Sequence, residues 1–252
     1  MTAGNILFRL LHSTAPRVDG IPDRFQLEKQ IFPSTLTANW SMAHDTFPLV
    51  VRMMDIPEFM EEVGAGLVIS VGGLTESVVK ASKSALFDWV RTHLEAKDFG
   101  LLSRFSFFLV TLLTRHHQDD RVTIPLMKTM ALLLESNLLR FLFEERKSED
   151  GIPASATDFG ERLYTALRDE IQKCTAVPKL SAAISVLIGL LPSDPDTETK
   201  TLRALLLFLG HKFPKVRKLT AEKLYTRLIL HDEIIDEEKV NVSCCPCLLF
   251  PG

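Results

Sequence analysis

The chain has 252 residues, 46% hydrophobic and 24% charged, a balance that excludes a wholly disordered protein. Its 29 Lys and Arg residues against 32 Asp and Glu residues give a formal net charge of −3, so no global positive field favours nucleic acid. The longest apolar stretches, 101–113 and 180–191, are shorter than the roughly 20 residues that a membrane span needs. The four cysteines do not indicate a disulfide scaffold, and we expect a cytoplasmic location.

Apolar residues recur every three or four positions through most of the chain, which predicts amphipathic helices. In residues 75–96, for example, Leu86, Trp89 and Val90 share one face, and most charged residues lie elsewhere. No segment shows the sustained alternation that is typical of strands, so the predicted fold is all-α. The predicted helices, in chain order, span 23–32, 47–54, 57–71, 75–96, 98–117, 121–145 with a break near 136–137, 158–173, 178–191, 195–212 and 214–230.

Local residue chemistry supports these helix boundaries. Proline precedes or begins four of the predicted helices, where its missing N–H costs nothing because that group has no helical acceptor. These prolines are Pro57, Pro178, Pro195 and Pro214. Two glycines at 72–73 end one helix, and Thr75 is placed to cap the next. Six large apolar residues are expected to be buried on the inner faces: Leu86, Trp89, Phe107, Phe108, Leu205 and Leu206.

The predicted helices form pairs that recur about every 40 residues, the scale of HEAT and armadillo repeats. Residues 214–224 also match the pattern P-x-V-R-x-x-x-A-x-x-L, in which Arg217 can reach an acidic group or a carbonyl across the turn. Because one such pair cannot bury its apolar face alone, several must stack. We therefore predict a HEAT/armadillo-like α-solenoid over 1–231, with a possible internal boundary at the polar loop 147–157, followed by a tail at 232–252.

Motifs for catalysis, metal binding or cofactor binding are weak. The adjacent pair His116 and His117 would point about 100° apart on a helix, so a solvated turn is favoured over a metal site. Gly64 and Gly66 lack the rest of a phosphate-binding loop and more simply allow two helices to pack closely. Cys174 has no nearby base motif. No catalytic residue, cofactor or metal is predicted, although an enzyme whose site forms only in space stays an alternative.

The densest basic cluster consists of Lys212, Lys215, Arg217 and Lys218, around one predicted inter-helix turn. One interpretation is a solvated face of a repeat helix, on which Arg217 only stabilises its own turn. The other is a binding patch for a partner with an acidic exterior, which a local positive field would steer. We predict these four residues as partner-binding residues.

The segment 232–252 departs from the helical pattern. It begins with an acidic run and ends with three clustered cysteines, Cys244, Cys245 and Cys247, beside an apolar end. We expect an unstructured tail. S-acylation of the cysteines is the alternative that would place the tail on a membrane.

Four segments carry a resemblance to a known family. They read HSTAPRVD at 12–19, GLVISVGGLTES at 66–77, RVTIPLMKT at 121–129 and FPKVRKLTAEKLY at 213–225. In this order they resemble the C-terminal region of the tubulin-folding cofactor D family, and the resemblance covers about residues 1–231. Since the chain is much shorter than that family, we expect a fragment or an alternative form of the C-terminal region.

The resemblance implies a function. Members of this family are cytosolic helical-repeat proteins and not enzymes. By this resemblance the chain is expected to capture β-tubulin after the chaperonin step and, with cofactors C and E, to assemble or disassemble the αβ-tubulin heterodimer. The resemblance also implies binding of an Arf-like small GTPase, support of GTP hydrolysis by tubulin, and association with microtubules, centrosomes or cell junctions. A generic HEAT-type scaffold for another client stays an alternative.

Overall fold

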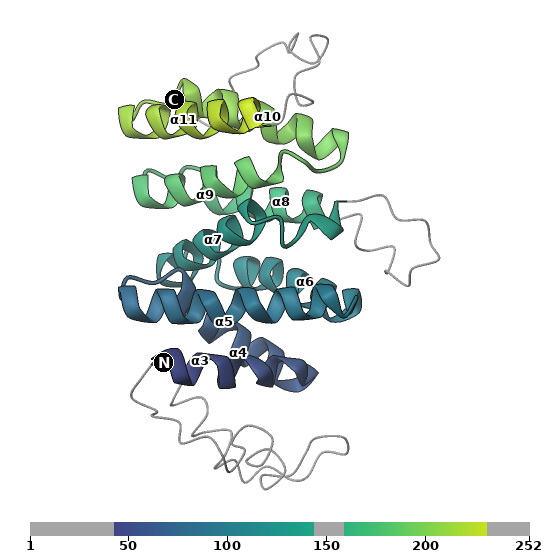
Figure 1. Ribbon diagram of the computed structural model, residues 1–252. Helices are drawn as coiled ribbons and strands as arrows, with labels where there is room; N and C mark the ends of the chain where they lie inside the picture. Colours follow the sequence, from purple (N-terminus) through teal and green to yellow (C-terminus); the bar gives the residue numbers. More distant parts are fainter. Residues whose placement is uncertain (1–42, 144–158, 231–252) are drawn as a thin grey trace, which may run out of the picture. The chain divides into compact units, whose positions relative to one another are not determined.

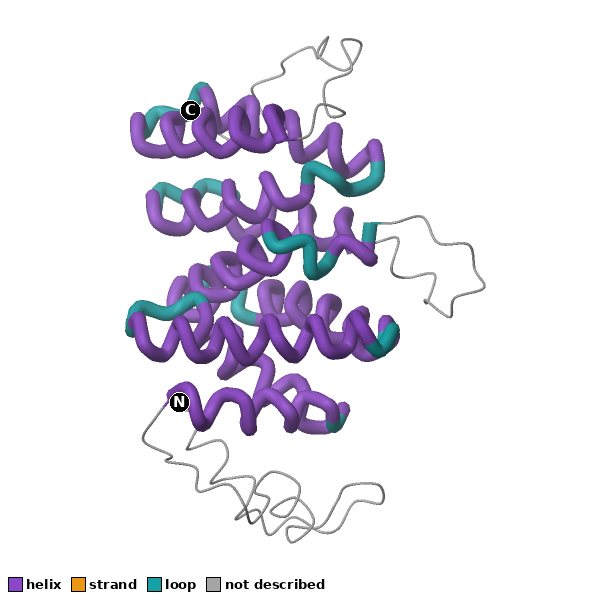
Figure 2. The backbone as a smooth tube through the Cα atoms, in the orientation of Figure 1, coloured by secondary structure: helices purple, strands orange, loops and turns teal. Residues whose placement is uncertain are grey.

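The computed structural model describes residues 43–143 and 159–230, and within these ranges every regular element is a helix (Figure 2). The predicted all-α fold class of packed helix pairs is therefore confirmed. The chain divides into two compact units, 1–108 and 109–252. The predicted helix 23–32, the loop 147–157 and the tail 232–252 lie outside the described residues.

In the first unit, α5 packs against both α3 and α4 (Figure 1). Its described elements are α3 (Ala43–Val51), the 3-10 helix η1 (Arg52–Asp55), α4 (Pro57–Val71), α5 (Glu76–Glu95) and the first part of α6 (Phe99–Arg115). The inner face of α5 carries Leu86, Trp89 and Val90, all buried. This is the face that the period of 3.6 residues predicted.

The helix ends of this unit follow local chemistry. Pro57 begins α4 as predicted, and Thr75 precedes α5, although its side chain makes no capping hydrogen bond. Lys97 ends α5 in a left-handed conformation with φ 57°, and the N–H of Asp98 donates to the carbonyl of His93 at 2.9 Å. This six-to-one bond satisfies a carbonyl that the helix leaves free.

In the second unit, α9 packs against α7, α8, α10 and α11. The described elements are the rest of α6, α7 (Asp120–Glu135), the 3-10 helix η2 (Arg140–Leu142), α8 (Phe159–Ile171), α9 (Val177–Leu190), α10 (Pro195–Leu209) and α11 (Pro214–Leu230). The predicted break near 136–137 is confirmed, because Asn137 adopts φ 57° and the N–H of Leu138 donates to the carbonyl of Leu133. Pro195 and Pro214 begin α10 and α11 as predicted.

The burial predictions are confirmed for four residues and wrong for one. Leu86, Trp89, Phe108 and Leu205 are buried, and Phe107 is half-buried. Leu206 is 41% exposed. Adjacent residues on a helix point about 100° apart, so Leu206 turns away when Leu205 faces the core. The close packing predicted at Gly64 is confirmed, since a Cβ there would lie 3.0 Å from the Phe108 ring.

Gly189 of α9 lies directly against Leu134 of α7. A Cβ at this position would lie 2.6 Å from the Cβ of Leu134, which no side-chain rotation of Leu134 can relieve. We expect Gly189→Ala to lower the free energy of unfolding by roughly 1–3 kcal/mol through overpacking, as measured by urea unfolding. Gly100→Ala is the control, because Gly100 lies in α6 with only one atom, 3.9 Å away, near the added Cβ. It should stabilise by up to about 1 kcal/mol through helix propensity, and a neutral Gly189→Ala would contradict the observed packing.

Candidate partner-binding surface

The basic cluster lies at the turn between α10 and α11 and on the first turn of α11. Lys212, Lys215, Arg217 and Lys218 are all exposed. Pro214 begins α11 within the cluster, so Lys212 precedes the helix and the other three residues lie in its first five positions. Lys215 and Lys218 are three positions apart and share a face of α11, whereas Arg217 is two positions from Lys215 and points to another side.

The four residues differ in what they contact. Arg217 donates from Nη1 to the carbonyls of His211 at 2.8 Å and Lys212 at 3.2 Å, the cross-turn reach that the repeat pattern predicted. The Nζ of Lys212 lies 5.3 Å from the centre of the Phe213 ring. Lys218 forms an exposed ion pair with Glu222 at 3.6 Å. Arg217 thus stabilises the turn, whereas the lysines leave their charges at the surface.

His211 anchors this turn from inside. It is buried, and its Nδ1 accepts a hydrogen bond from the N–H of Phe213 at 3.2 Å. Burial, with the positive charges of Lys212 and Arg217 added, lowers the pKa of His211 below its ordinary value of 6.5. The folded chain therefore holds a neutral imidazole. As pH falls below 6.5 the unfolded chain takes up the proton first, so this residue makes the fold less stable at acid pH.

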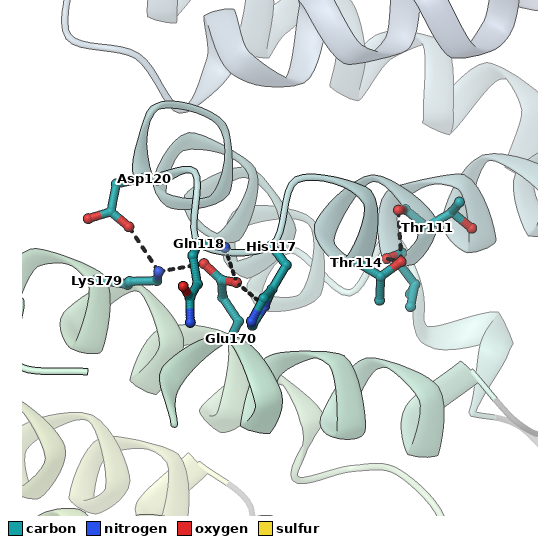
Figure 3. A network of polar contacts seen from close by, with 8 residues as sticks. Thr111, Thr114, His117, Gln118, Asp120, Glu170 and Lys179 are labelled. Atoms are coloured by element: carbon teal, nitrogen blue, oxygen red, sulfur yellow. Dashed lines mark hydrogen bonds and ion pairs between the residues drawn. The ribbon is translucent and has the colours of Figure 1, made fainter. Parts of the chain in front are cut away.

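A second polar cluster surrounds the buried carboxylate of Glu170 in α8 (Figure 3). The N–H of Gln118 donates to Glu170 at 2.9 Å, and Nδ1 of His117 lies 2.9 Å from the same oxygen. Lys179 of α9 forms ion pairs with Glu170 and, at 2.8 Å, with Asp120. Residues 117–120 are exposed and His116 is half-buried, so the turn is mostly solvated as predicted, but it also binds a buried charge from another helix.

Lys179 is charged in the folded chain although its side chain is only 6% exposed. Burial acts to lower the pKa of Lys179, but its hydrogen bonds to Asp120 and Glu170 outweigh that effect and raise the pKa above the ordinary 10.5. Sequence reasoning missed this pair. The sequence did contain a signal: Glu170 and Lys179 each lie within the apolar face of a predicted helix. A buried charge usually requires a partner of opposite charge, so the two could have been paired.

The first unit has its own polar cluster, centred on Asp55 at the end of η1. The carboxylate accepts a hydrogen bond from Nε1 of Trp89 at 2.6 Å and lies 3.1 Å from Nε2 of His93. Nδ1 of His93 lies 3.5 Å from Asp98. The cluster joins η1 to α5 and to the turn that follows α5, so it stabilises the packing of these elements.

Other sites that the sequence raised do not assemble in the described part of the chain. There, no group of three or more His, Cys, Asp or Glu side chains is placed to hold a metal ion. Cys174 lies just after α8, with its sulfur 3.9 Å from the carbonyl of Ala176. Of the helices that the structure describes, none combines the length and the apolar character that crossing a membrane requires.

Comparisons with known proteins place these helices in a family. Tubulin-specific chaperone D of Dictyostelium discoideum is 23% identical over 244 residues, an alignment that covers 93% of this chain. The chain spans 16% of the length of that relative. No solved structure matches the chain. Residues 1–179, about seven-tenths of the chain, match the family described as "Tubulin folding cofactor D C terminal". The chain therefore belongs to the tubulin folding cofactor D C-terminal family.

Proposed function

We propose that this chain binds tubulin and acts in the folding of β-tubulin after the chaperonin step and in assembly of the αβ-tubulin heterodimer. The observation that carries the proposal is the family match over residues 1–179. The name of the Dictyostelium relative, a tubulin-specific chaperone, supports it over most of the chain. Packed helix pairs with charged residues on their outer faces suit this role, because such repeats offer extended surfaces to a protein partner.

The finer parts of the role rest on the family resemblance alone. We propose that the chain acts in the cytoplasm as a scaffold and not as an enzyme, and that with cofactors C and E it supports GTP hydrolysis by tubulin. An Arf-like small GTPase is a further proposed partner. Microtubules, centrosomes and cell junctions are the proposed places of action.

Affinity capture tests the proposal. The tagged chain is incubated with cytosolic extract and separately with purified αβ-tubulin, and bound material is probed for tubulin, for cofactors C and E and for small GTPases. Capture of tubulin from both sources is the expected result. Capture of some other client in place of tubulin would support a generic helical-repeat scaffold and contradict the role in tubulin folding.

The basic cluster gives a sharper test at residue level. Tubulin is an acidic partner, so Lys215→Glu with Lys218→Glu is expected to lower the association rate roughly three- to tenfold at low ionic strength. The difference should shrink as salt rises, because screening removes steering between exposed charges. Stopped-flow or biosensor measurement of the association rate at low and high salt checks both parts.

The matched control is a double variant that reverses two lysines outside the basic cluster, so the net charge of the chain changes by the same amount. Lys80 of α5 and Lys128 of α7 are exposed, and their reversal to Glu should leave the association rate nearly unchanged. The melting temperature of the cluster variant should stay close to that of the parent, since the ion pair of Lys218 with Glu222 is exposed. Equal rates for parent and cluster variant at low salt would place the tubulin contact outside the basic cluster.

A further inference from the structure

The outward face of α11 carries exposed apolar side chains. Tyr225 and Ile229 are 67% and 58% exposed, and because they are four positions apart they lie one above the other on the same face. Ala221, four positions before Tyr225, is exposed as well. Single large apolar residues are common on protein surfaces, whereas a continuous patch of them is typical of a surface that another protein covers. We call residues 221, 225 and 229 the apolar stripe of α11.

The opposite face of the same helix makes its contacts with the rest of the unit. Val216 and Leu224 are buried there, and the buried hydroxyl of Thr220 donates to the carbonyl of Val216 at 2.8 Å. α11 packs against α9 and α10. A helix whose outer side faces only water is usually polar on that side. Apolar residues on both sides of α11 therefore indicate a second contact, on its outward face.

The apolar stripe continues into the basic cluster. Lys218 precedes Tyr225 by seven positions, which is two helical turns, so both side chains leave the helix on the same side. At a rise of about 1.5 Å per residue, Lys218 lies about 10 Å from Tyr225 and about 16 Å from Ile229 along the helix axis. Glu222 is the one acidic residue of α11. The outward face is thus basic at its first turns and apolar toward its end.

We propose that αβ-tubulin contacts this chain along the outward face of α11, with acidic groups near Lys215 and Lys218 and an apolar side chain packed against Tyr225 and Ile229. This inference rests on the proposed function and adds to it the residues that hold the partner after encounter. An acidic partner suits the basic end by charge. Tyrosine suits the other end, because it is among the residue types that most often carry binding energy at protein interfaces.

The two ends are expected to affect different rates. Exposed charges mainly steer the approach of a partner, so they change the association rate and their effect falls as salt rises. An apolar contact forms only in the docked complex, so its loss shortens the lifetime of that complex. The stripe should therefore control dissociation, and salt should not remove its effect.

Biosensor measurement of purified αβ-tubulin binding to the full chain tests this division. Tyr225→Ala should raise the dissociation rate roughly tenfold or more and leave the association rate within about twofold, at low and at high salt. Tyr225→Phe keeps the aromatic ring and should raise the dissociation rate less than about threefold. Leu74→Ala is the control, because Leu74 is 94% exposed in the turn before α5, and it should change neither rate.

Ala221→Arg is a second variant that does not depend on removing a side chain. Ala221 is exposed and arginine is a good helix former, so the fold should tolerate the change, as the melting temperature will show. The variant adds positive charge, so a contact made by charge alone would form faster. A packed contact would be blocked, and we expect affinity for tubulin to fall roughly tenfold.

The outcomes separate this inference from the proposed function. If the parent binds tubulin and both Tyr225→Ala and Ala221→Arg bind it as the parent does, the inference is overturned and the proposed function stands. An equal loss in Leu74→Ala would also overturn it, since any exposed apolar residue would then have the same effect. A parent chain that binds no tubulin would contradict the proposed function and this inference together.

Two other occupants of the outward face would give distinct results. Analytical ultracentrifugation of the parent should show a monomer; a dimer that Tyr225→Ala dissociates would assign the face to a second copy of the chain. Ile234 and Ile235 follow α11 closely in the sequence, and their joint replacement by serine should leave tubulin affinity unchanged. A roughly tenfold gain would assign the face to the chain's own segment. Either result would overturn the inference.

Discussion

Replacing Trp89 with alanine is expected to lower the free energy of unfolding by about 3–5 kcal/mol. The indole is 5% exposed and packs edge-on against Phe105, with ring centres 5.4 Å apart. Its Nε1–H also donates to Asp55 at 2.6 Å. The variant therefore creates a cavity beside Phe105 and removes the donor that anchors η1 to α5. Chemical denaturation followed by circular dichroism measures the loss.

Two further variants separate these causes. Trp89→Phe keeps an aromatic ring but removes the donor, so it should cost about 1–3 kcal/mol, less than alanine. Leu74→Ala deletes a large apolar side chain that is 94% exposed, and it should change stability by no more than about 0.5 kcal/mol. A Trp89→Ala chain as stable as the parent would contradict the assignment of the buried face of α5.

Glu170→Gln is expected to destabilise the fold by about 3 kcal/mol or more, because it leaves the buried ammonium of Lys179 without its buried partner. The side chain of Glu170 is fully buried and bonds to both Lys179 and the N–H of Gln118. Asp120 still pairs with Lys179 in the variant, which places the loss toward the lower end of the range for a broken buried pair. Urea unfolding at neutral pH provides the measurement.

Asp169→Asn is the matched control for this variant. Asp169 is the neighbour of Glu170 on α8, and its pair with Arg168 is exposed, so the change should cost less than about 1 kcal/mol. Glu170→Leu combined with Lys179→Met removes both charges and should be more stable than Glu170→Gln. A double variant no more stable than Glu170→Gln would show that packing, and not the unpaired charge, causes the loss.

The network also predicts a dependence on alkaline pH. The folded pKa of Lys179 is raised above 10.5, so the unfolded chain releases this proton first as pH rises. The stabilisation is complete below pH 10.5 and declines as pH rises through the folded pKa. A chain without Lys179, such as the double variant, should lose this part of the alkaline decline.

Helix positions in this protein were predictable from the sequence because their causes are local. Pro57, Pro195 and Pro214 begin helices at the predicted residues, and the break after α7 lies where Ser136 and Asn137 interrupt the apolar pattern. Proline lacks a backbone N–H, so it favours the first turn of a helix whatever the rest of the fold. The apolar pattern of an amphipathic helix repeats every 3.6 residues, so the helix can be recognised from its own segment alone. The repeat pattern at 214–224 is also local; it predicted that Arg217 reaches an acidic group or a carbonyl across its turn, and the partner is the carbonyl of His211.

The width of each buried face was decided by tertiary packing. Leu205 and Leu206 are adjacent and chemically identical, yet the first is buried and the second 41% exposed. Periodicity identifies the centre of an apolar face, but its edges depend on how far the neighbouring helices extend. Those neighbours are set by the whole fold, so the pattern along one helix could not distinguish the two leucines.

The polar clusters were determined by tertiary structure alone. Gln118 and Glu170 are 52 positions apart, and Lys223 meets Glu135 across 88 positions. The sequence around a charged residue does not indicate which distant residue will be its partner. The sequence by itself determined the helices, the family resemblance and the basic cluster, since each of these lies in continuous segments. Which charges are paired follows only from helices brought together by packing.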